Sequence, residues 1–341
     1  MTTNIYHKNK HKKNKKNKNK THKTHKTHKT HKKNRRNRRN KKNKTHKKTI
    51  SEIRAIKEKK YKKAKCSPKT EGTLPFSCYT PESLHKLKDI WNARHPDVQI
   101  ETNDPKSIWD NLRSYMSSSC NTESCWLKHQ CIKNDIDPSL WDNSFAPKSP
   151  SKWEKKPNEW LTSVDIEQVM KQYEQVYKCF DFIGPSPIDF DKPLLWGECV
   201  WEELCKFQLK EQLIKGKKKI GIIFNLDEHT EDGSHWVSMF INIENKEIYY
   251  FDSYGDRVPK LIYNFVKKIK KQAEAINQKF KFKWVSNRHQ YSSSECGMYS
   301  IFFIIELLKD SKNFHDFQNN KYSDKYMKKL RKIYFNSYST I

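Results

Sequence analysis

Four side chains in the second half of the chain have the types and the order needed to attack a carbonyl group. They are His235, Asp252, Gln290 and Cys296. A thiolate is a strong nucleophile, an imidazole can act first as its base and then as an acid, and a carboxylate can orient that imidazole. An amide N–H donor near the sulfur can hold the oxyanion of a tetrahedral intermediate. A lone Cys or His is usually structural, but this combination predicts acyl transfer through a thioester.

The nucleophile candidate stands at the start of an expected helix. Cys296 opens an apolar run that reaches Leu308, and a run that is apolar on almost all sides predicts a helix buried on most faces. The N-terminus of a helix carries partial positive charge, which favours a thiolate there. Gly297 leaves room for a carbonyl to approach the sulfur. Gln290, six residues earlier, is expected to supply the oxyanion hole with the backbone N–H of Cys296.

The base and its carboxylate partner are expected to stand at the same end of a hairpin. His235 opens an alternating strand at 236–243, and Asp252 closes the strand at 248–252, 17 residues after His235. If Ile243 pairs with Glu247 across the turn, Asp252 lies opposite Ser238. The sequence therefore predicts that His235 and Asp252 lie near the same end of the sheet. Asp252 is expected about three residues along from His235, not directly opposite it.

The motifs around these residues resemble a known family. Gly233-Ser-His-Trp236, Tyr250-Phe-Asp-Ser253 and Gln290-Tyr-Ser-Ser-Ser-Glu-Cys-Gly297 are similar to the signature of the SUMO-protease and adenain-like cysteine proteases. Trp160-Leu161 followed by Ile166 resembles the start of that family's catalytic domain, so the resemblance covers about residues 158–310. Glu123-Ser-Cys-Trp126 looks like the extension found in thiol proteases of large DNA viruses. Many relatives have Asp or Asn where Glu295 stands here.

The resemblance implies a cysteine endopeptidase that often cleaves after Gly-Gly. Its viral members process structural precursors during particle maturation, and the tail and helical extension favour that type here. Trp160, Trp236 and Gly297 are then expected to bind substrate or support the site, and neither a metal nor another cofactor is expected. Three alternatives remain open: a deconjugating protease for a ubiquitin-like modifier, an acetyltransferase with a similar His/acid/Cys set, and a nucleic-acid-binding structural protein with an inert protease domain.

The expected fold is α+β, with a mainly antiparallel sheet packed on the central helix that carries Cys296. We expect a disordered basic tail over 1–65, a helical region over 66–150 and the catalytic domain over 151–341. Thr80-Pro81 and Asp104-Pro105 each pair an N-cap residue with Pro at the first helical position. The remaining expected elements are helices at 164–177, 195–213 and 258–269, a loop at 183–193, and strands at 220–226 and 280–285.

Positive charge is concentrated in the tail. Of 69 Lys and Arg residues, 29 lie in residues 1–65 beside only two acids, so the rest of the chain carries a net charge of +3. The tail has almost no apolar residues and includes four consecutive Thr-His-Lys units from Thr21 to Lys32. Such a polycation predicts non-specific nucleic-acid binding through phosphates. A localisation signal or a solvated tail without a partner is the alternative.

The nine cysteines are expected to be thiols, because no export signal is evident at the N-terminus. Cys120, Cys125, His129 and Cys131 have spacings that fit no standard zinc finger, so we expect buried thiols there rather than a metal. The longest apolar stretch, Met298–Leu308, is too short for a membrane span. The sequence thus predicts a soluble protein in the host cytoplasm or nucleus, or packaged in the virion.

Other charged groups near the motifs have simpler interpretations. His229 and His289 lack partners at the required spacing and are expected on loop surfaces. Four acids precede His235: Asp227, Glu228, Glu231 and Asp232. They could attract a basic segment of a substrate, but a solvated loop explains them equally well.

Overall fold

The computed structural model describes residues 63–128 and 137–337. The tail predicted over 1–65 therefore lies almost entirely outside the described residues. His129 and Cys131 of the cysteine-rich cluster also lie outside them.

The region from 66 to 150 is helical, as predicted. Its helices are α3 (Pro81–Arg94), α4 (Pro105–Met116), α5 (Glu123–Trp126) and α7 (Ser139–Ser144). The side chain of Thr80 accepts a hydrogen bond from the Ser83 N–H, and Asp104 accepts one from the Ser107 N–H, so both predicted N-caps are confirmed. A separate hydrophobic core joins these helices, with Tyr79, Trp126 and Phe145 buried in it.

A five-stranded sheet forms the centre of the region after residue 150. Its strands, in spatial order, are β1 (Phe180–Pro187), β2 (Lys219–Asn225), β3 (Trp236–Asn242), β4 (Glu247–Phe251) and β5 (Lys281–Val285). The pairs β2–β3 and β3–β4 are antiparallel, whereas the outer pairs β1–β2 and β4–β5 are parallel. The α+β class is confirmed. The sheet is mixed rather than mainly antiparallel, because helical segments instead of short turns connect β1 to β2 and β4 to β5.

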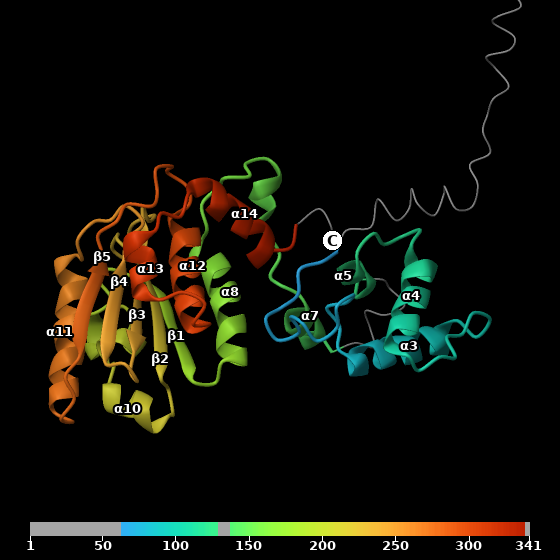
Figure 1. Cartoon of the computed structure of the whole chain (residues 1–341), viewed down its shortest axis with the longest axis horizontal. Coiled ribbons are helices and arrows are strands. Elements are labelled where there is room, and N and C mark those ends of the chain that lie inside the picture. The colour runs from blue at the N-terminus through green and yellow to red at the C-terminus, as the bar shows by residue number, and fades with distance from the viewer. Residues whose placement is uncertain (1–62, 129–136, 338–341) are drawn as a thin grey trace, which may run out of the picture. The chain divides into compact units, whose positions relative to one another are not determined.

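Helices cover both faces of this sheet (Figure 1). One face packs against α8 (Ser163–Val176), α12 (Cys296–Leu308), α13 (Phe314–Asn319) and α14 (Asp324–Tyr334). The other packs against α10 (Leu209–Ile214) and α11 (Lys260–Glu274). In α12 every residue except Glu306 is buried, which confirms the predicted central helix. Its N-terminal residue, Cys296, is therefore held by a rigid, fully packed element.

Two predicted elements between α8 and β2 are wrong. The segment at 183–193, predicted as a loop because of its prolines, contributes its first residues to β1. Proline is tolerated there because β1 is an edge strand, and its pairing with β2 skips residues 184–185 at a bulge. The helix predicted at 195–213 is broken into η2 (Leu195–Gly197), α9 (Glu202–Cys205) and α10. Trp196 and Gly197 have positive φ values, which no α-helix accommodates.

The predicted hairpin is confirmed, but its register differs by one residue. Asn242 pairs with Glu247 and Ser238 with Phe251. Continued by one step, this register sets Asp252 level with Val237 instead of Ser238. The turn is one residue longer than predicted, and the carboxylate therefore lies one residue closer to His235.

The expectation of free thiols is wrong for six of the eight described cysteines. Three disulfides connect Cys66 to Cys78, Cys120 to Cys125, and Cys199 to Cys205, with Cα–Cα distances of 4.9, 5.5 and 6.6 Å. These distances lie in the range that a disulfide can bridge. Because each pair is brought together by local turns of the backbone, composition alone could not predict it. Cys179 and Cys296 are the free cysteines among the described residues.

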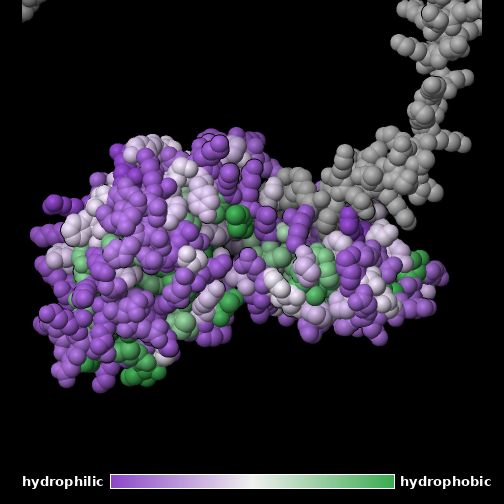
Figure 2. Space-filling model, viewed as in Figure 1, coloured by the Kyte–Doolittle hydropathy of each residue, from purple (hydrophilic) through white to green (hydrophobic). Residues whose placement is uncertain are grey.

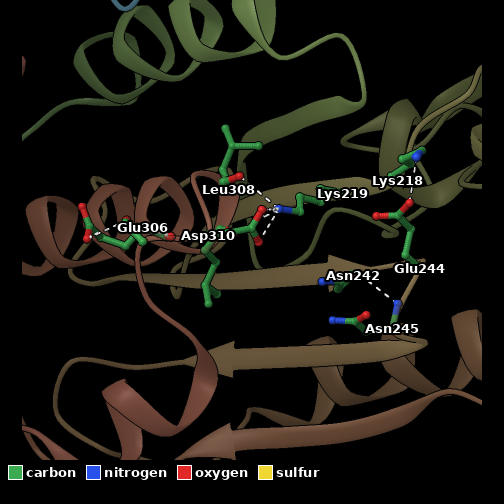
Figure 3. Close-up of polar contacts among 10 residues, drawn as sticks. Lys218, Lys219, Asn242, Glu244, Asn245, Glu306, Leu308 and Asp310 are labelled. Carbon is green, nitrogen blue, oxygen red and sulfur yellow. Dashed lines mark hydrogen bonds and ion pairs between the residues drawn. The ribbon is translucent and has the colours of Figure 1, made fainter.

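The C-terminal end of α12 is held by a buried lysine from the first residue of β2 (Figure 3). The Lys219 Nζ donates to the carbonyl of Leu308 at 3.0 Å and contacts both carboxylate oxygens of Asp310 at 2.6 Å. The last carbonyls of a helix lack intrahelical donors and carry partial negative charge, so a cation is favourable there. Lys219 thus fixes the helix at the end opposite to Cys296.

We expect Lys219→Met to lower the free energy of unfolding by about 1–3 kcal/mol, because the last carbonyls of α12 lose a buried donor. Lys218→Met is the matched control: the Lys218 Nζ contacts Glu244 at 2.7 Å, but both side chains are more than half exposed (Figure 3). Urea unfolding of both variants measures the difference. Equal stability of the two variants would contradict the anchoring role of Lys219.

The view in Figure 2 shows a mostly hydrophilic surface with small, separate hydrophobic patches. This agrees with the concentration of large apolar side chains in the three hydrophobic cores. Among the described residues, no helix has the length and apolar content required to span a bilayer.

Candidate active site

The sheet brings His235 and Asp252 together, as the motif spacing predicted. The imidazole Nε2 lies 2.8 Å from Asp252 Oδ1, and both side chains are largely buried. The backbone N–H of Tyr254 also donates to Asp252 Oδ1, at 2.8 Å. The carboxylate is therefore fixed by its own loop and in turn fixes the imidazole. Because Nε2 is engaged by the carboxylate, Nδ1 is the ring nitrogen available to a thiol.

Cys296, the first residue of α12, is the third member of this group. Its side chain is buried, with 2% exposed, and lies close enough to the His235 imidazole to contribute to the raised pKa of that ring. Burial alone would lower the pKa of His235, but hydrogen bonds to Asp252 and Cys296, together with their charges, raise it to about 9. The imidazole is thus held as a cation at neutral pH, next to a sulfur at a helix N-terminus. The arrangement favours a thiolate–imidazolium pair.

Tyr254 completes the surroundings of the imidazole, although no motif singled it out. Its ring stacks on the His235 ring with a centroid distance of 4.7 Å and an interplanar angle of 15°. The charge of Cys296 contributes, after burial, to raising the pKa of Tyr254, which sets the phenol near the sulfur. The only sequence signal for this residue is its position two residues after Asp252.

Gln290 is buried beside this group, and its role stays a prediction. Its Oε1 accepts from the Ser253 hydroxyl at 2.6 Å, and its Nε2 donates to the Ser292 carbonyl at 2.6 Å. The same Nε2 lies 3.5 Å from the Tyr254 hydroxyl. The amide is thus held beside the tyrosine that covers His235, with its Nε2 between the Ser292 carbonyl and the Tyr254 hydroxyl.

Gly297 is packed tightly rather than open. A Cβ at this position would lie 3.1 Å from Leu161 Cβ and 3.3 Å from Trp236 Cδ1. The Trp236 indole N–H donates to the Leu161 carbonyl at 3.0 Å. Close packing of Leu161 and Trp236 on the helix start therefore gives a second reason for glycine, beyond the predicted space for a substrate carbonyl.

A cleft of about 760 Å³ reaches this point. Leu161 and Trp236, which contact the position of Gly297, belong to its lining, and so does Trp160, with 38% of its surface exposed. Six acids also line the cleft, against one lysine (Lys152): Glu159, Asp165, Asp227, Glu228, Glu231 and Asp232. The cleft is thus strongly negative, and Leu161 and Trp236 of its lining border the residue that follows Cys296.

The residue before the nucleophile forms a buried ion pair. Glu295 Oε2 lies 2.7 Å from Arg331 Nε, and the two side chains are 0% and 4% exposed. Arg331 comes from α14, 35 residues after Cys296, so no local sequence pattern indicated it. Removing one partner of a buried pair leaves an uncompensated charge and commonly costs about 3–5 kcal/mol.

Of the two other histidines near the motifs, one differs from expectation. His289 is fully buried: its Nε2 lies 3.0 Å from the Phe317 carbonyl, and its Nδ1 accepts from the Tyr322 N–H at 3.2 Å. Burial lowers its pKa to about 4, so it is neutral, and the prediction of a surface loop is wrong. His229 is exposed in a turn, as expected, and its Nδ1 lies 2.7 Å from Asp189 Oδ2. Neither lies in the His235–Asp252–Cys296 group.

Comparisons with known proteins agree with this geometry. The family model described as the Ulp1 protease family, C-terminal catalytic domain, matches residues 199–341. A protein of Acanthamoeba polyphaga mimivirus, named as a candidate thiol protease, is 30% identical over 256 residues, covering 74% of this chain and 82% of that protein. A SUMO-1 cysteine protease of African swine fever virus is 27% identical over 248 residues, covering 66% of this chain and 88% of the viral protease.

The fold also has a solved counterpart. A crystal structure of an African swine fever virus protease superposes with a TM-score of 0.59 at 22% identity, covering 80% of this chain and 95% of that one. This superposition extends beyond the residues matched by the family model. It supports the α+β architecture over most of the chain.

Proposed function

The chain belongs to the Ulp1 protease family and is a cysteine protease, and from this premise we propose that it cleaves protein precursors after small residues such as Gly-Gly, with Cys296 as its nucleophile. The observation that carries this proposal is the single contact network in which Asp252, His235 and Cys296 follow one another. Each of the three comes from a different element, and packing of α12 against β3 holds them together.

The proposed mechanism has two half-reactions, the acylation of Cys296 and the hydrolysis of the resulting thioester. The Cys296 thiolate attacks the carbonyl carbon, and the oxyanion is held by the Cys296 backbone N–H and the Gln290 amide. The His235 imidazolium gives its Nδ1 proton to the leaving amine, so that a thioester remains. Neutral His235 then takes a proton from water as the water attacks the thioester, and collapse of the tetrahedral intermediate releases the carboxylic acid and leaves the Cys296 thiolate beside the His235 imidazolium. Asp252 holds the imidazole in the required tautomer throughout.

Small residues are proposed at the cleavage site because the cleft ends at close-packed side chains. Leu161 and Trp236 lie against Gly297, and Trp160 forms the exposed entrance. This geometry leaves little space for a branched side chain next to the sulfur. We further propose that residues 151–341 form the catalytic domain and residues 66–150 a helical N-terminal region.

The acids of the cleft also suggest which charge the substrate carries upstream of the cleavage site. Asp227 and Asp232 form no ion pair with another described side chain, whereas Glu228 is paired with Lys192 at 2.8 Å. Free carboxylates in a cleft attract cations and repel anions. A substrate with Lys or Arg upstream of Gly-Gly therefore fits the cleft best.

Internally quenched peptides test both features. We expect Gly-Gly to exceed Val-Val at the cleavage site by at least about 100-fold in kcat/KM, and Lys to exceed Glu upstream by about 10-fold at low salt, mainly through KM. Asp227→Asn with Asp232→Asn should remove most of the charge preference. Glu211→Gln with Glu274→Gln, at exposed sites on α10 and α11, is the matched control.

A second measurement separates precursor processing from deconjugation of a ubiquitin-like modifier. Mass spectrometry of candidate structural precursors and of fusions to ubiquitin-like modifiers locates the cleaved bonds, with Cys296→Ala as the blank. Preferential cleavage of the modifier fusions would favour a deconjugating protease. If Val-Val peptides are cleaved as well as Gly-Gly peptides, the proposed specificity is wrong.

We also propose that the tail over 1–65 binds nucleic acid. A salt-dependent anisotropy titration with random DNA tests this binding.

A further inference from the structure

We propose that Arg331 is a positioning residue for the nucleophile: it holds the segment that precedes Cys296 and the wall of the cleft at Glu159 in one arrangement. This inference rests on the proposed role of Cys296. It assigns to α14 a part in catalysis without any contact with the substrate.

The guanidinium of Arg331 connects two segments that are far apart in the sequence. Its Nε donates to Glu295 Oε2 at 2.7 Å, and its Nη2 donates to the Ser294 carbonyl at 3.0 Å. Its Nη1 donates to the Glu159 carbonyl at 2.7 Å. Ser294 and Glu295 lead directly into Cys296, and Glu159 precedes the cleft residues Trp160 and Leu161. A planar fork of donors fits three such acceptors at fixed angles, which a lysine cannot do.

The position of Glu295 explains why this contact matters for the sulfur. Glu295 is the N-cap residue of α12, yet its side chain forms no capping hydrogen bond with the first helical N–H groups. A carboxylate at an N-cap normally accepts from those groups and so competes with any other anion there. Here Arg331 binds the carboxylate instead. The positive end of α12 is therefore left to the thiolate of Cys296.

The length of the Glu295 side chain fits this arrangement. Its second oxygen, Oε1, accepts from the Ser294 hydroxyl at 3.0 Å, while Oε2 reaches the guanidinium. The Trp153 ring covers the guanidinium from η1 (Ser151–Glu154), with 4.4 Å from the Arg331 Cζ to the ring centroid. Both ends of the ion pair are thus buried and oriented by additional contacts.

Few other ionisable groups face these atoms in the described structure. Toward Glu295 they are Arg331 of α14 and Tyr299 of α12, whose pKa is raised by burial and further by the charges of Asp324 and Glu295. Toward Cys296 they are His235 before β3, Asp252 after β4, and Tyr254. Without Arg331, the charge of Glu295 would act on Cys296 with no cation beside that carboxylate to offset it.

The test uses the full-length chain and reads out the sulfur directly. Four variants are compared with the wild type: Arg331→Gln, Glu295→Gln, the double variant with both changes, and Lys332→Gln. Lys332 is an exposed cation on the same helix, so its loss is the matched control. The rate at which iodoacetamide alkylates Cys296 is followed by peptide mass spectrometry from pH 4 to 10, and kcat and KM are measured on a cleaved peptide.

For Arg331→Gln we expect the midpoint of the alkylation profile to rise by about one pH unit, because an unpaired carboxylate opposes the thiolate. We expect kcat to fall by about 100-fold, with a smaller change in KM, because the segment before Cys296 is displaced. The double variant should return the midpoint to that of the wild type, and Lys332→Gln should leave both quantities unchanged.

An Arg331→Gln variant with a lower melting temperature but a wild-type midpoint would overturn the proposal, since a purely structural role moves only stability. If Arg331→Gln does not fold, the double variant and Glu295→Gln decide the matter: a kcat equal to that of the wild type in both would also overturn it. Alkylation does not require a substrate. A failure of the proposed peptidase specificity would therefore leave this test intact.

Discussion

Replacement of Cys296 by Ala is expected to lower kcat/KM by at least about four orders of magnitude, because no other described group can form the thioester. Stability should change little, since the thiol is small and α12 keeps all its other buried contacts. Peptide hydrolysis and thermal unfolding measure the two effects on the same sample. The variant should also lose all labelling by a peptide chloromethyl ketone.

The chain provides a matched control for this experiment. Cys179 is the other free cysteine among the described residues, and it precedes β1 rather than lying in the group with His235. Cys179→Ala should therefore keep the activity and the labelling of the wild type. Residual cleavage by Cys296→Ala above that of a blank would show that the nucleophile has been assigned to the wrong residue.

Replacement of His235 by Gln is expected to lower kcat/KM by about 10³–10⁴-fold, since both proton transfers of the mechanism pass through its Nδ1. The remaining activity should lose the alkaline fall that the wild type shows near pH 9, where the imidazolium, with a pKa of about 9, gives up its proton. A pH profile of kcat/KM for both proteins measures this. A wild-type profile that stays flat from pH 8 to 10 would contradict the thiolate–imidazolium pair.

The same group predicts a pH dependence of stability. The pKa of His235 rises from 6.5 to about 9 on folding, so the folded state binds the proton more tightly than the unfolded chain. This contribution is fully present below about pH 6.5 and is lost as the pH rises through about 9; it is on the order of a few kcal/mol. The stability difference between the wild type and His235→Gln should shrink over that interval. A difference that grows with pH would reverse the sign and refute the assignment.

The sequence was most informative where one local property decides the structure. The run from Cys296 to Leu308 is apolar on nearly every side, and a continuous apolar run of that length can be stable only as a buried helix. Caps such as Thr80 and Asp104 work within four residues and were correct for the same reason. The order His235, Asp252, Cys296 predicted the group itself, because few arrangements other than a thiol protease require that order and spacing.

Predictions failed where a residue's role depends on distant partners. The prolines after Ile183 indicate a loop locally, but their place on an edge strand, at a bulge, lets β1 form. The hairpin register was off by one, since the apolar alternation includes Ile243 in the strand, whereas the structure places this residue in the turn. His289 has no local mark of burial, yet its two ring nitrogens are paired by residues about 30 positions later.

The sequence by itself therefore determined the chemistry: which side chains could attack, accept a proton and orient, and on which kinds of element they stand. Tertiary structure alone decided how that chemistry is supported. Three supporting contacts join residues that have no regular spacing in the sequence. They are the stacking of Tyr254 on His235, the packing of Leu161 against Gly297, and the ion pair between Arg331 and Glu295. Such contacts arise when helices and strands pack, and packing depends on shape and distance in space, which periodicity along a chain does not encode.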